Sequence, residues 1–479
     1  MYEPGWTAIL PPVCAIALAI ISRQVILSLL AGIWLGWWLL GDASPFTALA
    51  VTIESVVAVL GDAGDAKVIA FALVIGAMIA TMERTGGVRG FVAWLERRRW
   101  VNDARRAEWL AWGTGIVVFI ESNLTLLVAG AVSRPLFDRF RVSRERLAYI
   151  IDSTSAPVCI LVPLNAWGAF NLGLLGNTDL ENPLATFLRA IPLNFYSILA
   201  VLLAAAAIAF RWNFGPMAKA EERTRGGRVL WPHAAPMVDP ALLGSDHADN
   251  ADGAGHQGPA PAGPAFMLAP IGVMVAGVPL GLYVTGDGNP AAGSGSTSVL
   301  WAVLAGLATV WIMALIRQRR RISELMEVSL QGAGGLLPVA VILLLALALG
   351  DVTDALGTGG FVSQLVGRNV PVMLLPALVF LVACFTAFAI GSSWATFAIM
   401  IPIAMPIALA LGIEPAVLLG ALLSGAVFGD HASPISDTTV VASMAAATDL
   451  IDHVRTQLPY ALVAAVVALA GYLVVGVAM

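Results

Sequence analysis

The chain has 479 residues, of which 59% are hydrophobic and only 12% are charged. A typical soluble domain carries about 25% charged residues, so this chain lacks the surface charge that a soluble protein of its length needs. The formal net charge of −5 decides nothing by itself, because the distribution of the charges matters more. The composition excludes a soluble globular protein and predicts an integral membrane protein.

The first apolar run covers residues 6–21 and has no basic segment before it. It contains Pro11 and Pro12, and we expect a retained first helix and no cleaved signal peptide. Further along, the uncharged runs at 198–210 and 336–349 extend with uncharged flanks to the roughly 20 residues that cross a bilayer. The cysteines lie in apolar segments and fit no metal motif, so we expect them to pack in the core: Cys14, Cys159 and Cys384.

The composition changes abruptly at residues 215–264, which are first basic and then rich in Pro, Gly, Ala, Asp and His. Such a stretch cannot bury apolar surface, so we predict a flexible cytoplasmic linker. The linker divides the chain into a first membrane repeat, residues 1–214, and a second, residues 265–479. Isolated histidines in such a loop usually neither bind metal nor sense pH, and three lie here: His233, His247 and His256.

The two repeats share four features in the same order. Each has an apolar run, a Thr-Gly-Gly segment, a longer apolar stretch interrupted by small hydroxyl residues, and a polar break that begins with Asp and contains Pro. The interruptions lie at residues 121–125 and 391–396, and the breaks at 152–157 and 430–437. Four matching features in one order indicate an internal duplication.

The positions of Lys and Arg indicate how the repeats cross the membrane, because cytoplasmic loops collect basic residues. Arg clusters flank the apolar stretch at about 107–140 on both sides, so a single crossing would leave one cluster outside. We therefore predict a hairpin that enters from the cytoplasm and turns near Ser122 and Asn123. Irregular backbone at that depth must be surrounded by protein or by a water-filled cavity. The matching stretch at about 371–411 is expected to enter from outside.

The predicted fold is an all-α integral membrane protein of two inverted repeats. Each repeat has about five transmembrane helices, one re-entrant hairpin and one helix broken at mid-membrane, at about 146–176 and 414–448. Both termini then lie on the external side of the cell inner (plasma) membrane. Inverted repeats with broken helices are typical of secondary transporters, which hold substrate and coupling ions near the midplane.

The polar breaks and the hairpin tips supply oxygen ligands, which a hard cation such as Na⁺ prefers. A carboxylate in a membrane segment costs about 2.5–3.5 kcal/mol on insertion scales, so it is a functional candidate by default. The alternative is that the Asp residues cap the half-helices. We predict ion binding by Asp430, Asp437, Ser433, Ser436, Thr438, Ser122, Asn123, Thr125, Ser392, Ser393 and Thr396.

A second set is predicted to bind protons or substrate: Glu121, Asp152, Ser153, Thr154, His431, Trp394 and Asn165. Alternatives stay open for two of them. Glu121 could form a buried ion pair with a scaffold arginine, and His431 could be a plain hydrogen-bonded histidine. Trp394, at a hairpin tip, could line a substrate cavity together with Trp167.

Three segments resemble the NhaC family of sodium/proton antiporters, which belongs to the wider ion transporter superfamily. They are Gly-Asp-His-Ala-Ser-Pro-Ile-Ser-Asp-Thr-Thr at 429–439, Asp-His-Val-Arg-Thr-Gln-Leu-Pro-Tyr at 452–460, and Gln-Val-Ile-Leu-Ser-Leu-Leu-Ala-Gly-Ile-Trp-Leu-Gly at 24–36. The hairpin tips resemble the Ser-Asn-Thr tips that hold sodium in related carboxylate transporters. The second tip departs from that pattern, with Ser393 in place of Asn and Trp394-Ala395 inserted.

The resemblance implies sodium/proton exchange, with Na⁺ at Asp430, Asn123 and Ser122. It equally allows Na⁺- or H⁺-coupled exchange of organic anions or amino acids, since the family includes malate/lactate exchangers. No cofactor is implied beyond Na⁺ and H⁺ as coupling or transported ions. The expected partners are these ions, a small organic solute, the lipid bilayer and a second copy of the chain, but no nucleic acid. The homodimer is expected to move its transport domains as elevators against fixed scaffold domains.

The sequence disfavours two other classes of function. An intramembrane hydrolase is disfavoured because the sequence has no Gly-x-Gly-Asp, HExxH or Gly-x-Ser-x-Gly motif, so we expect no enzyme. A passive channel would be excluded by saturable, stoichiometric counter-transport.

Overall fold

The structure is built of helices, as expected for the predicted all-α membrane protein. A computed structural model describes residues 5–22, 24–41, 44–97, 101–119, 121–163, 165–232, 234, 262–289, 293–358, 361 and 371–479. Within these ranges every regular element is a helix. Eight helices are long and apolar enough to cross a membrane, or up to 11 if each of three bent pairs is one span. An all-helical, multi-pass membrane protein is thereby confirmed.

The first half of the chain contains the following helices: η1 Trp6–Ile9, α1 Leu10–Ser22, α2 Val25–Leu40, α3 Pro45–Val59, α4 Ala63–Arg84, α5 Gly87–Arg97, α6 Ala104–Val117, α7 Ser122–Arg139, α8 Arg144–Ser153, α9 Ala156–Leu161, α10 Ala166–Gly176, α11 Pro183–Ala190, η2 Ile191–Leu193, α12 Phe195–Phe210 and α13 Pro216–Arg225. In the stretch expected to form the first hairpin, α6 and α7 pack against each other. The expected broken helix corresponds to α8, α9 and α10.

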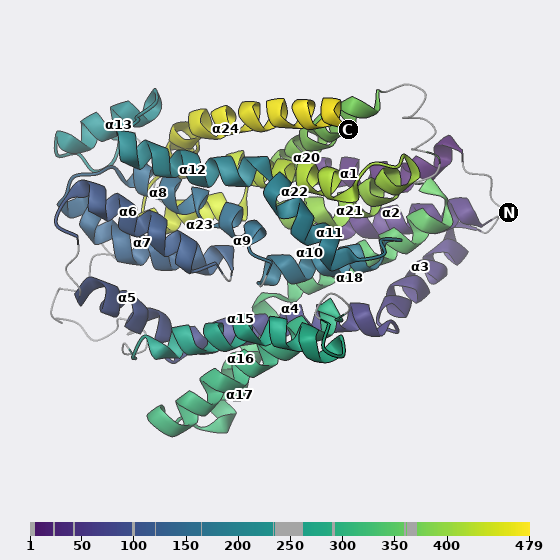
Figure 1. The fold of residues 1–479 in the computed structure, drawn as a ribbon, viewed down its shortest axis with the longest axis horizontal. Helices are drawn as coiled ribbons and strands as arrows, with labels where there is room; N and C mark the ends of the chain where they lie inside the picture. Colours follow the sequence, from purple (N-terminus) through teal and green to yellow (C-terminus); the bar gives the residue numbers. More distant parts are fainter. Residues whose placement is uncertain are drawn as a thin grey trace.

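The second half contains α15 Ala265–Thr285, α16 Gly295–Gln318, α17 Ile322–Gly335, α18 Leu337–Ala355, η5 Val372–Leu374, α20 Leu375–Ile390, α21 Ser393–Ala410, α22 Pro415–Ala432, α23 Asp437–Ala446 and α24 Leu450–Ala478. The second expected hairpin corresponds to α20 and α21, and the second broken helix to α22 and α23. In Figure 1, α15 and α16 lie along the lower side of the molecule with α4, and α12 and α24 along the upper side.

Prolines explain where the two broken helices are interrupted. Ser433 is extended (φ −83°, ψ 131°) and ends α22, because the ring of Pro434 disfavours helical backbone in the residue before it. In the first half, Ser155 is non-helical (φ −95°, ψ −91°), and Pro157 lies in the first turn of α9, where its missing N–H breaks no helical hydrogen bond. The first of these spans is also bent by 41° between Arg144–Leu161 and Ala166–Gly176, after the predicted break at 152–157.

The start of the expected flexible linker is instead ordered and packed. Residues Pro216–Arg225 form α13, and the buried Arg223 guanidinium pairs with Glu145 of α8 at 2.6 Å. Glu221 of α13 accepts hydrogen bonds from the backbone N–H and the hydroxyl of Ser143, at 2.9 and 2.6 Å. Flexibility was the wrong prediction for this stretch, because its charges have buried partners far away in the sequence. Residues 235–261 and all three linker histidines, His233, His247 and His256, lie outside the described residues.

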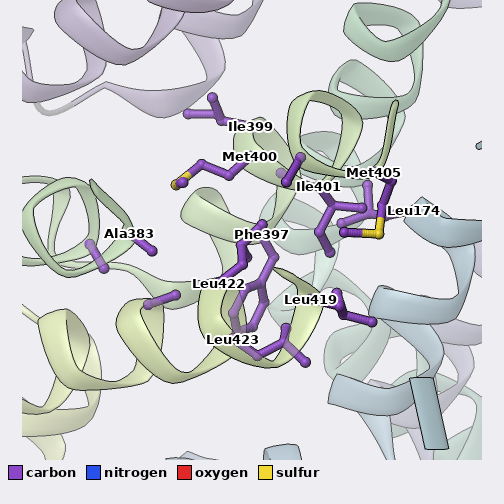
Figure 2. Close-up of a cluster of buried hydrophobic side chains, with 14 of the residues drawn as sticks. Leu174, Ala383, Phe397, Ile399, Met400, Ile401, Met405, Leu419, Leu422 and Leu423 are labelled. Carbon is purple, nitrogen blue, oxygen red and sulfur yellow. The ribbon is translucent and has the colours of Figure 1, made fainter. Parts of the chain in front are cut away.

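The largest buried apolar cluster holds α20, α21 and α22 together. Figure 2 shows Phe397 of α21 beside Leu422 and Leu423 of α22, Met405 of α21 next to Leu174 of α10, and Ala383 of α20 on the opposite side. These helices also pack closely through glycine, since a Cβ on Gly425 would lie 2.3 Å from the carbonyl oxygen of Phe380. Tight apolar packing therefore surrounds the polar break at the end of α22.

Helices of the two halves contact each other in a reciprocal pattern. α7 of the first half packs against α23 of the second, and α21 of the second half packs against α10 of the first. Likewise α12 packs against α22, and α24 against α8. Both polar breaks are therefore enclosed by helices from both halves.

Candidate ion-binding site

The Asp430 carboxylate lies at the last turn of α22 and is surrounded by hydroxyl groups. Ser393 at the start of α21 donates to Oδ2 at 2.7 Å. On the other oxygen, Ser436 donates a hydrogen bond to Oδ1, and Thr438 donates to Oδ1 at 3.4 Å. Asp430 is 1% exposed, and no Lys or Arg of the described residues forms an ion pair with it. The structure thus brings four of the predicted residues together around one buried negative charge.

The turn between α20 and α21 is joined directly to the break between α22 and α23. Gly391 has the left-handed backbone that glycine favours (φ +76°), and a Cβ there would lie 2.7 Å from the carbonyl oxygen of Ile435. Ser433 donates to the carbonyl oxygen of Phe388 at 2.8 Å. The Ser433 hydroxyl uses its proton for this contact and does not hydrogen-bond Asp430. This contact holds Ser393 within reach of Asp430.

Two further residues of the second tip maintain its backbone. Ser392 is the N-cap of α21, where its hydroxyl accepts the N–H of Ala395 at 3.3 Å. Thr396 donates its hydroxyl to the carbonyl oxygen of Ser392 at 2.9 Å. Neither hydroxyl contacts Asp430, so their predicted role in ion binding has no direct geometric support.

The tip between α6 and α7 is built around Glu121. Its carboxylate caps α7 by accepting the N–H of Leu124 at 2.8 Å, and Ser122 donates to it at 3.2 Å. Thr125 donates its hydroxyl to the carbonyl oxygens of Val118 and Glu121 and so closes the turn. Among the described residues, the ion pairs of the buried arginines are with acids other than Glu121.

Asn123 connects this tip to the second break. Its side chain hydrogen-bonds the Asp437 carboxylate at the first turn of α23, and its Oδ1 is buried without a hydrogen-bond partner. The charges of Glu121 and Asp430 both interact with that of Asp437. Close packing permits this approach, because a Cβ on Gly130 of α7 would lie 2.6 Å from the Cβ of Ala445 in α23. Both hairpin-like tips therefore meet the same break, one at Asp430 and the other at Asp437.

Cation chemistry at this place would rest on carboxylate and neutral oxygens. Across the described chain, no three His, Cys, Asp or Glu side chains come together in the manner that holds a metal ion. Hydroxyl and amide oxygens around single carboxylates suit a weakly bound, hard monovalent cation better than a tightly held transition metal.

A second polar cluster lies around Asp152 at the end of α8. Its Oδ2 lies 3.3 Å from Nε2 of His453 and accepts a hydrogen bond from Gln457 at 2.8 Å. His431 is 4.0 Å away through its Nε2, and the same nitrogen is 3.2 Å from the Ser153 hydroxyl. The other nitrogen of His431 is 2.6 Å from the Tyr196 hydroxyl. Asp152, Ser153 and His431 are thus brought together as one buried network.

The remaining candidates contact backbone groups or aromatic rings. Thr154 donates to the carbonyl oxygen of Ile150 at 2.8 Å and packs against Gly115, where any Cβ would lie 2.0 Å from its hydroxyl. Asn165 caps α10 and donates to the carbonyl oxygens of Phe119 and Cys159, at 2.8 and 2.7 Å. Trp394 packs against Trp167 and Phe170, with ring centroids 5.2 and 4.7 Å apart.

Sequence reasoning gave no site role to three residues of the Asp152 network: Tyr196, His453 and Gln457. The segment at 452–460 contains two of them and carried the family resemblance. A buried His and Gln four residues apart lie on one face of a helix, which is the signal that could have identified them. Tyr196 at the start of α12 carries no comparable signal.

The chain matches the Na⁺/H⁺ antiporter family over residues 158–477. The chain belongs to this family. Membership of this family indicates a secondary transporter and not an enzyme. The match covers both the second half of the chain and the end of the first.

Several known proteins are similar in sequence to this chain or to part of it. An uncharacterised protein of Haemophilus influenzae is 31% identical over 495 residues, which cover 98% of this chain and 90% of that one. The arginine/ornithine antiporter ArcD of Halobacterium salinarum is 42% identical over 106 residues, 22% of each chain. The Na⁺/H⁺ antiporter NhaC of Alkalihalophilus pseudofirmus is 48% identical over 65 residues, 14% of each chain. The NhaC resemblance predicted from three short segments is confirmed.

Solved structures of transporters share the fold of this antiporter family member. The YdaH transporter of Alcanivorax borkumensis is 15% identical with a TM-score of 0.56, and the match covers 97% of this chain and 98% of that one. MtrF of Neisseria gonorrhoeae is 12% identical with a TM-score of 0.57, over 96% of this chain and 94% of that one. At such low identity the likeness concerns the fold alone.

Proposed function

We propose that the protein exchanges Na⁺ for H⁺ across the cell inner (plasma) membrane at a mid-membrane site centred on Asp430. The observation that carries the proposal is the buried Asp430 carboxylate, which has three hydroxyl neighbours and no Lys or Arg partner among the described residues. A carboxylate in such a place is expensive to keep charged, so it gains strongly from binding either a cation or a proton. Competition between the two for one charge produces exchange.

The Na⁺ ligands in this proposal are Asp430, Asn123 and Ser122, with Ser393, Ser436 and Thr438 next to the carboxylate. The unpartnered Oδ1 of Asn123 supports a ligand role, because a buried amide oxygen without a donor is unfavourable. Asp437 provides a second carboxylate, which is hydrogen-bonded to the side-chain amide of Asn123. Glu121 supplies further negative charge at the same tip.

The proposed architecture is that of two inverted repeats with re-entrant hairpins α6–α7 and α20–α21. It is supported by the reciprocal contacts of α7 with α23 and of α21 with α10. The moving part would comprise both hairpins and both broken helices, and the protein would function as a homodimer with a fixed scaffold. A bound ion neutralises the buried charge and permits movement, whereas the bare carboxylate opposes it.

Asp430→Asn tests the ion site. We expect it to abolish Na⁺-dependent proton movement in everted membrane vesicles, because an amide can neither lose a proton nor balance the charge of Na⁺. The control is Asp354→Asn, which removes an exposed carboxylate at the end of α18. Full Na⁺-dependent exchange by a well-folded Asp430→Asn protein would show that the site is elsewhere.

A second candidate is Na⁺- or H⁺-coupled exchange of an amino acid or organic anion by the same fold. It is favoured by the local similarity to an arginine/ornithine antiporter and by the aromatic cluster of Trp167, Trp394 and Phe170. Nε1 of Trp167 is buried without a partner and could donate to a solute. Uptake of labelled amino acids and dicarboxylates into proteoliposomes, with and without a Na⁺ gradient, separates the two candidates. Solute counterflow that needs the gradient would favour the second.

A further inference from the structure

The Asp152 network differs from the Asp430 site in the kind of groups that surround the carboxylate. Asp152 is 0% exposed, and its Oδ2 faces an imidazole nitrogen of His453 and the amide of Gln457. Three buried atoms of this trio have no hydrogen-bond partner: Oδ1 of Asp152, Nδ1 of His453 and Oε1 of Gln457. Each of the three side chains therefore has one buried polar atom that could still form a hydrogen bond.

A single proton would remove the net charge of this buried pair. Shared between Asp152 and His453, it either creates a carboxylate–imidazolium pair or leaves both groups neutral, and in each case the pair has no net charge. Without that proton the pair holds one buried negative charge. Burial makes the difference large, because an uncompensated charge in a low dielectric is costly.

The geometry distinguishes His453 from the other nearby imidazole. Both nitrogens of His431 have hydroxyl partners, those of Tyr196 and Ser153, and its Nε2 lies 4.0 Å from Oδ2 of Asp152, farther than the 3.3 Å of His453. His453 faces the carboxylate with one nitrogen and keeps the other free. The proton is therefore better accommodated between Asp152 and His453.

The network is also coupled to the Asp430 site. Gln457 donates to Asp152 at 2.8 Å and to the carbonyl oxygen of His431 at 2.5 Å, and His431 follows Asp430 on α22. The charge of Asp152 interacts with those of Asp430 and Asp437. The titratable groups whose charges interact with the pair are Tyr196 of α12, Asp430 and His431 of α22, and Asp437 of α23. No Lys or Arg of the described residues pairs with Asp152.

We propose that Asp152 and His453 form a proton-binding site separate from Asp430, and that a proton held there weakens Na⁺ binding at Asp430. The inference rests on the proposed function, because it needs Na⁺ at Asp430. A proton on the pair removes a negative charge close to the Na⁺ ligands. The two ions then oppose each other even though they bind different side chains, which adds to any direct competition at Asp430. Coupling between sites of this kind typically amounts to about 5–150-fold in affinity.

The test measures binding of radioactive Na⁺ to the purified full-length protein between pH 6 and pH 8. We expect wild-type affinity to fall as the pH falls. Asp152→Asn removes the negative charge permanently, so it should bind Na⁺ about tenfold more weakly at pH 8 and respond less to pH. His453→Gln keeps the Asp152 charge but removes the imidazole that accepts the proton. Its Na⁺ affinity should equal that of the wild type at pH 8 and should begin to fall at a lower pH than in the wild type.

The matched control is Thr456→Val on the same face of α24, because the Thr456 hydroxyl bonds only to carbonyl oxygens of its own helix. Its Na⁺ binding should follow the wild type at every pH. If Asp152→Asn and His453→Gln also follow the wild type, the inference is overturned while the proposed function stands. If the wild-type protein binds no Na⁺, or if Asp430→Asn binds Na⁺ as well as the wild type does, the proposed function is overturned instead. If Asp152→Asn does not fold, as judged by gel filtration, the pH response of His453→Gln decides.

Discussion

The buried arginines contrast with the two candidate carboxylates. Arg144, Arg146 and Arg223 pair with Asp138, Glu108 and Glu145, respectively, at 2.9, 2.8 and 2.6 Å. Arg146 also donates to the carbonyl oxygen of Ala207 at 2.9 Å, so it joins α6, α8 and α12. These acids are neutralised permanently by a side chain. Asp430 and Asp152 have no such partner among the described residues and stay available to mobile ions.

Removing one member of a buried pair should therefore destabilise the protein without acting on ion binding directly. We expect Glu108→Gln to cost about 3–5 kcal/mol, because it leaves the Arg146 charge buried and unpaired. Arg189→Gln is the control, since its pair with Glu414 is exposed and contributes about 0–1 kcal/mol. Thermal unfolding in detergent compares them. Equal melting temperatures for both variants would contradict this account.

Sequence reasoning identified the neighbours of Asp430 better than those of Asp152. Ser436 and Thr438 follow Asp430 within one short motif, and Ser393 was found because its tip repeats the first one. His453 and Gln457 contact Asp152 across 301 and 305 residues of sequence. No local pattern specifies such a contact, because it depends on how α24 packs against α8. Asn165 was predicted to bind protons or substrate, and its side chain hydrogen-bonds backbone groups.

At the scale of helices, the ends were predictable wherever local chemistry fixes them. Pro434 predicts the end of α22, and the hydroxyl-rich tips predict the starts of α7 and α21. α13 was missed because its basic composition suggests a solvated segment, whereas Glu145 and Ser143 provide distant partners for it. Contacts with residues distant in the sequence therefore decided the structure of this segment, and its local composition did not.

The turn between α20 and α21 gives a prediction at this scale. Gly391 and Gly412 both have left-handed backbone, at φ +76° and +66°, so alanine at either position carries the same backbone penalty of about 1–2 kcal/mol. Only at Gly391 would the new Cβ also meet another segment, the carbonyl oxygen of Ile435 at 2.7 Å. We expect Gly391→Ala to lose most Na⁺-dependent exchange in vesicles and Gly412→Ala to keep it. Equal activity of the two would refute a contact between tip and break as a requirement for exchange.

At the scale of the whole molecule, the proposed orientation makes a prediction about accessibility. The chain has only three cysteines, which can be replaced to give a cysteine-free background. Asp179→Cys, in the loop between α10 and α11, should then react with a membrane-impermeant maleimide added to intact cells. Glu222→Cys, on α13, should react only after the membrane is permeabilised. The opposite labelling pattern would reverse the predicted orientation.

Burial within the protein is distributed unevenly over the apolar helices. Of the 18 most apolar consecutive residues, 89% are buried in α22, against 33% in α15, α16 and α24. A change in bilayer thickness acts on helices that touch acyl chains, at fractions of a kcal/mol per Å of mismatch. Asp430 is carried by the enclosed α22, whereas His453, although itself 0% exposed, is carried by α24, whose apolar stretch is mostly exposed. Thicker or thinner membranes should therefore disturb the Asp152–His453 pair before they disturb the Na⁺ ligands, which makes lipid length a means of separating the two ions experimentally.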